Sequence, residues 1–150
     1  MSLRRVPLPN LVATQVLAQR LAPHLVAGDV IALRGGLGAG KTTFARALIS
    51  SLLRKDTEVP SPTYTLVQLY QGDTFPIFHF DLYRIEHPDD VFELAWEETH
   101  LGVALIEWPE RAGPHLPQWR LVLTFAGDAE NRQVTLEPHG EHWQTKLYGF

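Results

Sequence analysis

The chain has 150 residues, 45% of them apolar, which is the size and composition of one globular domain with its own core. Thirteen lysines and arginines against seventeen aspartates and glutamates give a net charge of −4, which argues against a simple binder of nucleic-acid phosphates. The lack of cysteine excludes a disulfide scaffold, and no window approaches the roughly 20 apolar residues of a membrane span. We predict a single cytoplasmic domain, residues 1–150, without a membrane partner.

The first third of the sequence alternates strand and helix patterns. Leu3–Leu8 alternates as a short strand, and Asn10 is a suitable N-cap for a helix that Pro23 shortens or kinks. The apolar run Val30–Leu33 predicts a buried strand. Directly after a glycine-rich turn, Lys41–Leu53 repeats its apolar residues every four positions, as a helix does.

The remaining segments favour strands, with one exception. Five of them have strand patterns: Thr65–Tyr70, Pro76–Phe80, Val103–Ile106, Arg120–Phe125 and Gln133–Glu137. The exception is Asp89–Glu98, which is acidic and helix-like, and whose Phe92 and Trp96 we expect on its core side because they lie four residues apart. The first part of the chain has helical crossovers between strands and the last part has hairpin-like strands. This order predicts a three-layer α/β domain with a mixed, partly parallel sheet.

The turn from Gly35 to Thr42 matches the phosphate-binding pattern G-x-x-x-x-G-K-[ST] at every fixed position, between strand and helix. Such a loop turns its backbone N–H groups toward phosphates, and the helix start adds a positive dipole end. Lys41 would reach the β and γ oxygens, and the Thr42 hydroxyl would ligate Mg²⁺. We therefore predict a P-loop NTPase-like fold. The expected phosphate-binding residues are Gly38, Ala39, Gly40, Lys41, Thr42 and Thr43.

Two acids at the ends of predicted strands can complete a hydrolytic site, which needs a carboxylate for the metal and a group that orients water. Asp81 follows the strand at Pro76–Phe80, and Glu107 follows the strand at Val103–Ile106. We assign Asp81 to the metal, directly or through water, and Glu107 to the attacking water; the exchanged assignment stays open. His79 alternates into the strand beside Asp81, where it would orient that carboxylate or serve as a structural histidine.

Other candidates rest on weaker patterns. Ser61 and Thr63 place two hydroxyls in a proline-containing loop that could sense a γ-phosphate, and Arg84 and Arg111 follow the acidic strand ends. For both arginines, an ordinary surface position is the commoner case. The histidines of the segment 139–142 lack the H-E-x-x-H spacing of a helical metal site, so we do not expect a metal there.

Four motifs, in an order and spacing that cover most of the chain, resemble the TsaE family. They are GLGAGKTT from Gly36 to Thr43, SPTYTLV from Ser61 to Val67, FHFDLYR from Phe78 to Arg84, and IEWPE from Ile106 to Glu110. The resemblance implies the ATP-hydrolysing component of bacterial N6-threonylcarbamoyladenosine synthesis on adenosine 37 of tRNA. It also implies TsaD and TsaB as protein partners, which carry out the transfer, so that tRNA is met indirectly through the complex. Activity would be slow alone and stimulated by these partners.

The resemblance also implies roles for individual residues. Residues expected at ATP, Mg²⁺ or the hydrolytic step are Leu11, Lys41, Thr42, Asp81, Glu107, Trp108 and Arg132. Two positions depart from the family pattern. Gly36 stands where an acidic residue is usual, which could loosen the loop, and Ala95 stands where glycine is common, which puts the geometry of its turn in doubt.

Charge is unevenly distributed along the chain. Ile85–Glu110 contains eight acidic residues and no lysine or arginine, a pattern that suits a basic partner surface or simply a solvated acidic face. Two other functions compete with the ATPase. One is a small-molecule kinase, although little of the chain is left for an acceptor site and a lid. The other is a non-catalytic, ATP-gated assembly module, in which Glu107 would be only structural.

Overall fold

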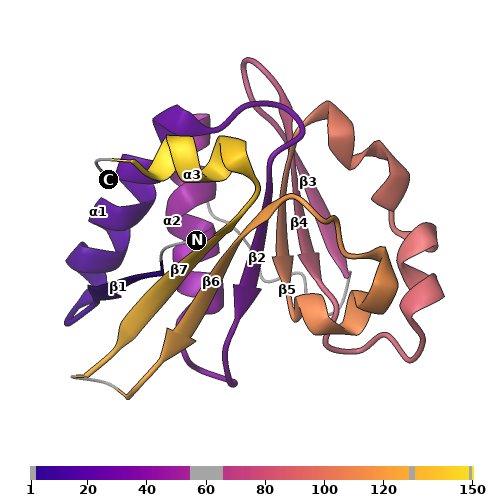
Figure 1. Cartoon of the computed structure of the whole chain (residues 1–150). Helices are drawn as coiled ribbons and strands as arrows, with labels where there is room; N and C mark the ends of the chain where they lie inside the picture. Colours follow the sequence, from indigo (N-terminus) through magenta and orange to yellow (C-terminus); the bar gives the residue numbers. More distant parts are fainter. Residues whose placement is uncertain (1–2, 55–65, 129–130, 149) are drawn as a thin grey trace.

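The computed structural model describes residues 3–54, 66–128, 131–148 and 150, and shows one sheet with helices on both faces (Figure 1). The strands are β1 (Arg4–Pro7), β2 (Val30–Arg34), β3 (Val67–Gln71), β4 (Pro76–Asp81), β5 (Val103–Glu107), β6 (Arg120–Ala126) and β7 (Gln133–His139). Within the described part of the chain, no helix has the length and apolar character needed to cross a membrane.

The seven strands form a single mixed sheet in the order β1-β7-β6-β2-β5-β4-β3. β2 lies at its centre and runs parallel to both neighbours, β5 and β6, and β4 continues the parallel part beyond β5. The outer pairs β1–β7, β6–β7 and β3–β4 are antiparallel. The predicted mixed, partly parallel sheet is therefore confirmed.

Helices cover the two faces of the sheet differently. The α-helices are α1 (Leu11–Leu21), α2 (Lys41–Leu53) and α3 (Glu141–Leu147), and the 3-10 helices are η1 (Ala22–His24), η2 (Pro88–Glu93), η3 (Trp96–Leu101) and η4 (Pro109–His115). β5 shows how the layers arise. Val103 and Leu105 pack with the α-helices, while Ala104 and Ile106 pack with η2, η3 and η4, because successive side chains of a strand face opposite sides.

The N-terminal helix α1 begins and ends where its sequence indicates. The Asn10 side chain accepts a hydrogen bond from the backbone N–H of Ala13 at 2.9 Å, which caps α1. The α-helical turns end at Leu21, and Pro23 lies in the 3-10 turn that follows. A capped start fixes the position of Leu11, which matters below because Leu11 lies close to the glycine-rich loop.

The acidic segment differs from the expected single helix. Ala95 has φ +64° and ψ 24°, a left-handed conformation that interrupts the segment between η2 and η3. The four-residue spacing therefore does not put Phe92 and Trp96 on one face. Trp96 is buried against Phe80, with ring centroids 5.1 Å apart, whereas Phe92 is 47% exposed and lies against His115. The prediction that Phe92 belongs to the core was wrong.

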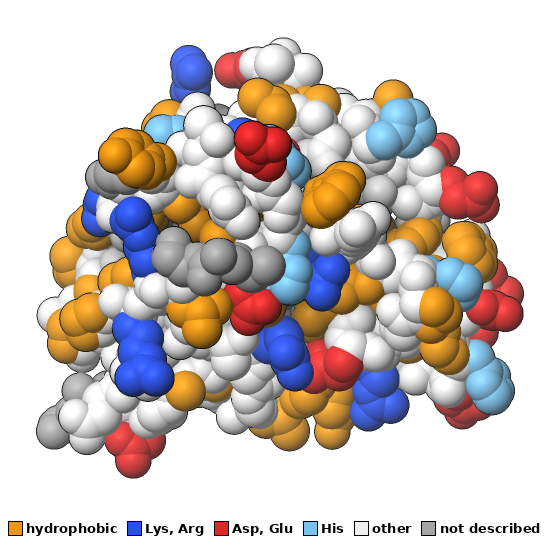
Figure 2. Space-filling model, viewed as in Figure 1, with side chains coloured by type: hydrophobic (Ala, Val, Ile, Leu, Met, Phe, Trp, Pro, Cys, Tyr) orange, Lys and Arg blue, Asp and Glu red, His pale blue; other side chains and the backbone are white. Residues whose placement is uncertain are grey.

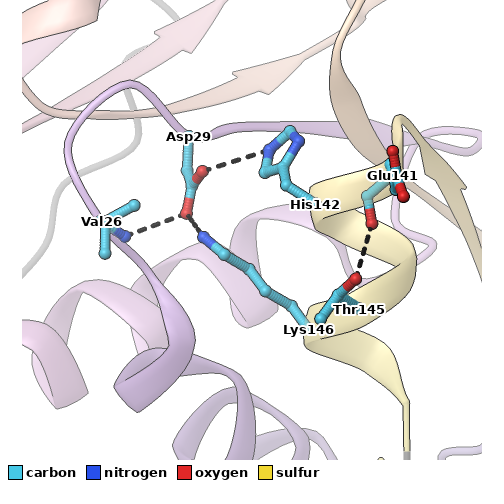
Figure 3. Close-up of polar contacts among 6 residues, drawn as sticks. All are labelled: Val26, Asp29, Glu141, His142, Thr145 and Lys146. Carbon is cyan, nitrogen blue, oxygen red and sulfur yellow. Dashed lines mark hydrogen bonds and ion pairs between the residues drawn. The ribbon is translucent and has the colours of Figure 1, made fainter.

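The C-terminal residues pack onto the domain. Trp143 of α3 is fully buried in the layer that contains α1 and α2. Asp29, which precedes β2 and is only 3% exposed, accepts the backbone N–H of Val26 and forms an ion pair with Lys146 of α3 (Figure 3). Among the described residues, no group of three histidine or acidic side chains could hold a metal.

Candidate functional site

A glycine-rich turn connects the end of β2 to the start of α2. Gly35 has φ +143°, and a Cβ placed there would lie 2.7 Å from the carbonyl oxygen of Phe125, so a side chain does not fit. Gly38 and Gly40 also have positive φ values, of 75° and 114°. The loop therefore follows a path that only glycine adopts at low energetic cost, and its last residue is the N-cap of α2.

Lys41 is the first residue of α2 and is 5% exposed. Its Nζ donates to the carbonyl oxygens of Gly35 at 2.6 Å and Gly36 at 2.9 Å. The same ammonium lies 4.2 Å from the ring centroid of Trp108. Burial lowers the pKa of Lys41, and the negative charges nearby, Glu107 foremost, oppose that shift. The Lys41 side chain is thus held at the loop with little access to water.

The two predicted acids end neighbouring parallel strands. Asp81 is the last residue of β4 and Glu107 the last residue of β5, and the two are direct partners in the ladder. They are 5% and 2% exposed. Asp81 accepts a hydrogen bond from the backbone N–H of Tyr83 at 3.0 Å. Because parallel strands end at the same edge of a sheet, both carboxylates meet the glycine-rich loop at the end of β2.

Glu107 makes the closest contact with the loop helix. Its Oε1 accepts a hydrogen bond from the Thr42 hydroxyl at 2.8 Å, and its Oε2 lies 2.7 Å from Nε2 of His79. The sequence left His79 as a partner of Asp81 or a structural histidine, and the structure shows its bond to the acid of the next strand, Glu107. β5 lies directly beside β2, and β4 lies one strand further away, which explains why Glu107 is the acid at Thr42.

Two hollows adjoin the loop. The first, of about 230 Å³, is lined by Leu37, Gly38, Ala39, Gly40, Lys41, Thr42, Thr43, Asp81, Glu107, Trp108 and Arg132. The second, of about 290 Å³, is lined by Leu8, Asn10, Leu11, Thr14, Ala39, Gly40, Thr43, Phe125 and Arg132. They share four residues, and Arg132 also donates to the carbonyl oxygen of Gly38 at 3.2 Å. The structure therefore brings Leu11 and Arg132 to the loop.

The other candidates are placed less centrally or not at all. Ser61 and Thr63 fall outside the described residues. Arg84 is exposed and lines neither hollow. Arg111 is exposed as well, with its guanidinium 5.8 Å from the ring centroid of Tyr83. The structure thus places neither arginine among the residues that line the two hollows.

Trp108 directly follows Glu107 and has φ +59°, a left-handed conformation. Its ring lies over Lys41 on one side, and Tyr83 approaches it with ring centroids 4.8 Å apart. Sequence reasoning did not single out Tyr83 as part of this arrangement. No local pattern could have shown it, because the contact joins residues that follow two different strands.

Acidic side chains gather over the 3-10 helices, at the right of the view in Figure 2. The exposed members of this surface include Glu86, Asp89, Glu93, Glu97 and Glu98. The charge segregation seen in the sequence is therefore also a segregation in space. It lies beside the site rather than within it, since none of these residues lines the two hollows.

Comparisons with known proteins identify relatives of this chain. The family model described as "Threonylcarbamoyl adenosine biosynthesis protein TsaE" matches residues 8–134. A protein named "tRNA threonylcarbamoyladenosine biosynthesis protein TsaE" from Bacillus subtilis is 37% identical over 135 residues, which cover 87% of this chain and 83% of that protein. A protein of the same name from Rickettsia conorii is 44% identical over 98 residues, 65% of this chain and 56% of that protein. The match therefore spans little more than half of the Rickettsia relative.

A solved structure gives the same result for the fold. The crystal structure of YdiB from Bacillus subtilis superimposes with a TM-score of 0.79 and 29% sequence identity, over 99% of this chain and 93% of that one. The fold is thus shared with a solved protein over nearly the whole chain. Since the family model covers most of the sequence and a relative covers most of both chains, this chain belongs to the TsaE family of threonylcarbamoyl adenosine biosynthesis proteins.

Proposed function

We propose that the chain binds and hydrolyses ATP with Mg²⁺ and thereby sustains the synthesis of threonylcarbamoyladenosine on adenosine 37 of tRNA. Family membership supports the pathway. The observation that carries the hydrolytic part is the contact between the Thr42 hydroxyl and Glu107, beside a glycine-rich loop and a buried lysine. This combination unites a phosphate cradle, a cation and a carboxylate within one hollow.

The residues present fit a magnesium ion. Mg²⁺ prefers oxygen ligands and is usually held by one or two carboxylates together with phosphate oxygens and water. The Thr42 hydroxyl and Glu107 carboxylate supply two such oxygens, and Asp81 ends the next strand. When bound, the ion would supply positive charge that neutralises the charge developing on the phosphates. The Thr42 contact favours Glu107 as the acid that shares the metal, which is the exchanged form of our first assignment.

Each residue of the site would then have its own role in nucleotide binding and hydrolysis. Backbone N–H groups of Gly38, Ala39 and Gly40 cradle the phosphates, with Thr43 near the α-phosphate. Lys41 exchanges its two carbonyl contacts for phosphate oxygens, while Trp108 covers it and excludes water. Asp81, held by the backbone N–H of Tyr83, orients the attacking water.

The second hollow would take the rest of the nucleotide. It shares Ala39, Gly40, Thr43 and Arg132 with the phosphate hollow, so a molecule lying along the loop can occupy both. Leu11 offers an apolar contact at its rim, and Arg132 offers a cation. We therefore place the adenosine part of ATP between the start of α1 and Arg132.

We further propose that TsaD and TsaB are the protein partners and that tRNA is met indirectly through them. The net charge of −4 and the acidic surface over the 3-10 helices disfavour direct contact with a polyanion. Hydrolysis by this chain would reset the complex between rounds of modification rather than carry out the transfer.

Multiple-turnover formation of threonylcarbamoyladenosine tests this role. The reaction contains tRNA, TsaD, TsaB, ATP and an independent supply of threonylcarbamoyl-adenylate, with or without this chain. We expect turnover to require the chain and to be lost with Lys41→Ala. Equal turnover without it would refute the proposed role.

Two variants separate nucleotide binding from hydrolysis. Lys41→Ala should lose affinity for a fluorescent ATP analogue, whereas Glu107→Ala should retain binding at saturating Mg²⁺ and lose hydrolysis. Glu110→Gln is the matched control, since Glu110 is an exposed acid three residues from Glu107 and outside both hollows. If Glu107→Ala supports full turnover of tRNA modification, the chain is an ATP-gated assembly module and not an ATPase.

A further inference from the structure

A fully buried histidine on β4 contacts the acid at the centre of the site. His79 has no exposed surface, and its Nε2 lies 2.7 Å from Oε2 of Glu107. The other carboxylate oxygen, Oε1, accepts the hydrogen bond from Thr42. Each oxygen of Glu107 therefore has a partner from a different element, His79 from β4 and Thr42 from α2.

Burying a histidine ring costs free energy unless its nitrogen atoms form hydrogen bonds. Its Nδ1 is buried and has no hydrogen-bond partner within residues 3–54, 66–128, 131–148 and 150. An unpartnered buried polar atom costs about 1–3 kcal/mol, which an apolar side chain at the same place would avoid. The adjacent residues Phe78 and Phe80 show that apolar side chains suit this strand. The hydrogen bond between the ring and Glu107 is thus the contact that explains a polar side chain at this position.

The geometry points to His79 as the positioning residue of Glu107, an inference that rests on the proposed function. His79 lines neither hollow, so it acts through the carboxylate rather than on the nucleotide. A glutamate side chain has three rotatable bonds, so a second hydrogen bond restricts its orientation more than the bond from Thr42 alone. The second bond, to His79, holds Oε1 toward the Thr42 hydroxyl, where the metal would be shared. Groups that orient metal ligands in this way have large effects on affinity and activity.

Three substitutions at position 79 test the inference. Glutamine places an amide nitrogen near the position of Nε2, asparagine places one near Nδ1, and leucine supplies neither. We expect His79→Leu and His79→Asn to lower kcat for ATP hydrolysis by about 10- to 100-fold, the usual effect of losing such a partner, while His79→Gln keeps most of the activity. KM for ATP should change little, because the loop and Lys41 remain.

A second readout does not depend on turnover. Binding of a fluorescent ATP analogue is titrated with Mg²⁺, and Mn²⁺ binding is followed by electron paramagnetic resonance. We expect His79→Leu and His79→Asn to need about 10-fold more divalent cation for half-maximal binding, with unchanged affinity in EDTA. His115→Leu is the control, because His115 bonds Asp89 at 2.6 Å in the acidic surface, away from both hollows, and should leave both readouts unchanged.

The outcomes separate this inference from the proposed function. If the wild-type chain neither hydrolyses ATP nor binds it with Mg²⁺, the proposed function fails and the inference falls with it. If the wild type does both, and a folded His79→Leu variant matches it in kcat and Mg²⁺ dependence, the inference alone is wrong. If His79→Leu does not fold, the glutamine and asparagine variants decide, and equal behaviour of these two overturns the positioning role.

Discussion

Ala95 shows how one side chain can conflict with the backbone that surrounds it. It is exposed and has φ +64°, in the left-handed region, at the junction of η2 and η3. A residue with a Cβ is disfavoured there by roughly 1–2 kcal/mol. Glycine has no such penalty, which agrees with the glycine that the family resemblance leads one to expect at this position.

We therefore expect Ala95→Gly to stabilise the protein. The relief of backbone strain exceeds the extra chain entropy of glycine in the unfolded state, so the free energy of unfolding should rise by about 0.5–1 kcal/mol. Urea unfolding followed by circular dichroism measures the change. Ala13→Gly, inside the right-handed helix α1, is the control and should change stability in the opposite direction by a similar amount. A loss of stability in Ala95→Gly would contradict the account of the strain.

At the level of single residues, the sequence predicts much of the site but not its pairwise contacts. The loop and the two acids follow from local patterns, because a glycine motif and the end of an apolar run are visible in the chain itself. The bond between His79 and Glu107 joins residues 28 positions apart, and only the register of β4 on β5 brings them together. Register depends on long-range packing, so the division of roles between Asp81 and Glu107 could not be read from the sequence.

At the scale of elements, β3 forms one edge of the sheet and carries a poorly satisfied side chain. The Tyr70 hydroxyl is buried and has no hydrogen-bond partner among the residues that the structure describes. Burial raises the pKa of this phenol above its ordinary value of 10.0, and the positive charge of Arg46 partly opposes the shift. The folded state therefore keeps this proton to a higher pH than the unfolded state does.

Tyr70→Phe should stabilise the protein, and increasingly so at alkaline pH. Removing an unsatisfied buried hydroxyl is worth about 1 kcal/mol at neutral pH. Above pH 10.0 the unfolded phenol ionises before the folded one, so the wild type loses stability as the pH rises and the variant escapes that loss. Urea unfolding at pH 7 and above pH 10 measures the difference. Tyr148→Phe, at a side chain that is 89% exposed, should match the wild type at every pH.

The accuracy of the sequence-based prediction differed between elements. The strands and α2 were predicted within a few residues, because their apolar runs and spacings are strong local signals. The acidic segment became two 3-10 helices instead of one helix. Its helical pattern relied on two aromatic residues four positions apart. The left-handed Ala95 between them interrupts the helix, so the two side chains do not lie on one face.

At the scale of the whole molecule, an ion pair ties the last helix to the central strand. Asp29 lies just before β2, at the end opposite the glycine-rich loop, and pairs with Lys146 of α3, with His142 3.6 Å away (Figure 3). The Asp29 side chain is 4% exposed and that of Lys146 is 17% exposed. This contact stabilises the fold at the side of the sheet that is remote from the candidate site.

We expect Lys146→Met to destabilise the protein without changing nucleotide affinity. The variant removes the ammonium group that pairs with the buried Asp29 carboxylate. This should lower the free energy of unfolding by about 2–3 kcal/mol, somewhat less than for a fully buried pair. Adding Asp29→Asn should recover part of this loss. Thermal unfolding and titration with a fluorescent ATP analogue measure the two effects separately. A change in nucleotide affinity of tenfold or more would show that the tether is coupled to the loop.

The contact between Lys41 and the Trp108 ring bears on the tryptophan fluorescence of the protein. The four tryptophans occupy different environments: Trp96 and Trp143 are buried in the two core layers, the latter 5.0 Å from Lys146 Nζ, Trp119 is exposed, and Trp108 lies 4.2 Å from Lys41 Nζ. An arriving phosphate that draws Lys41 away would change the emission of Trp108 far more than that of the other three. Loss of this signal in Trp108→Phe would identify its source. Trp108 would thus report phosphate binding at the candidate site by its own fluorescence, without an added label.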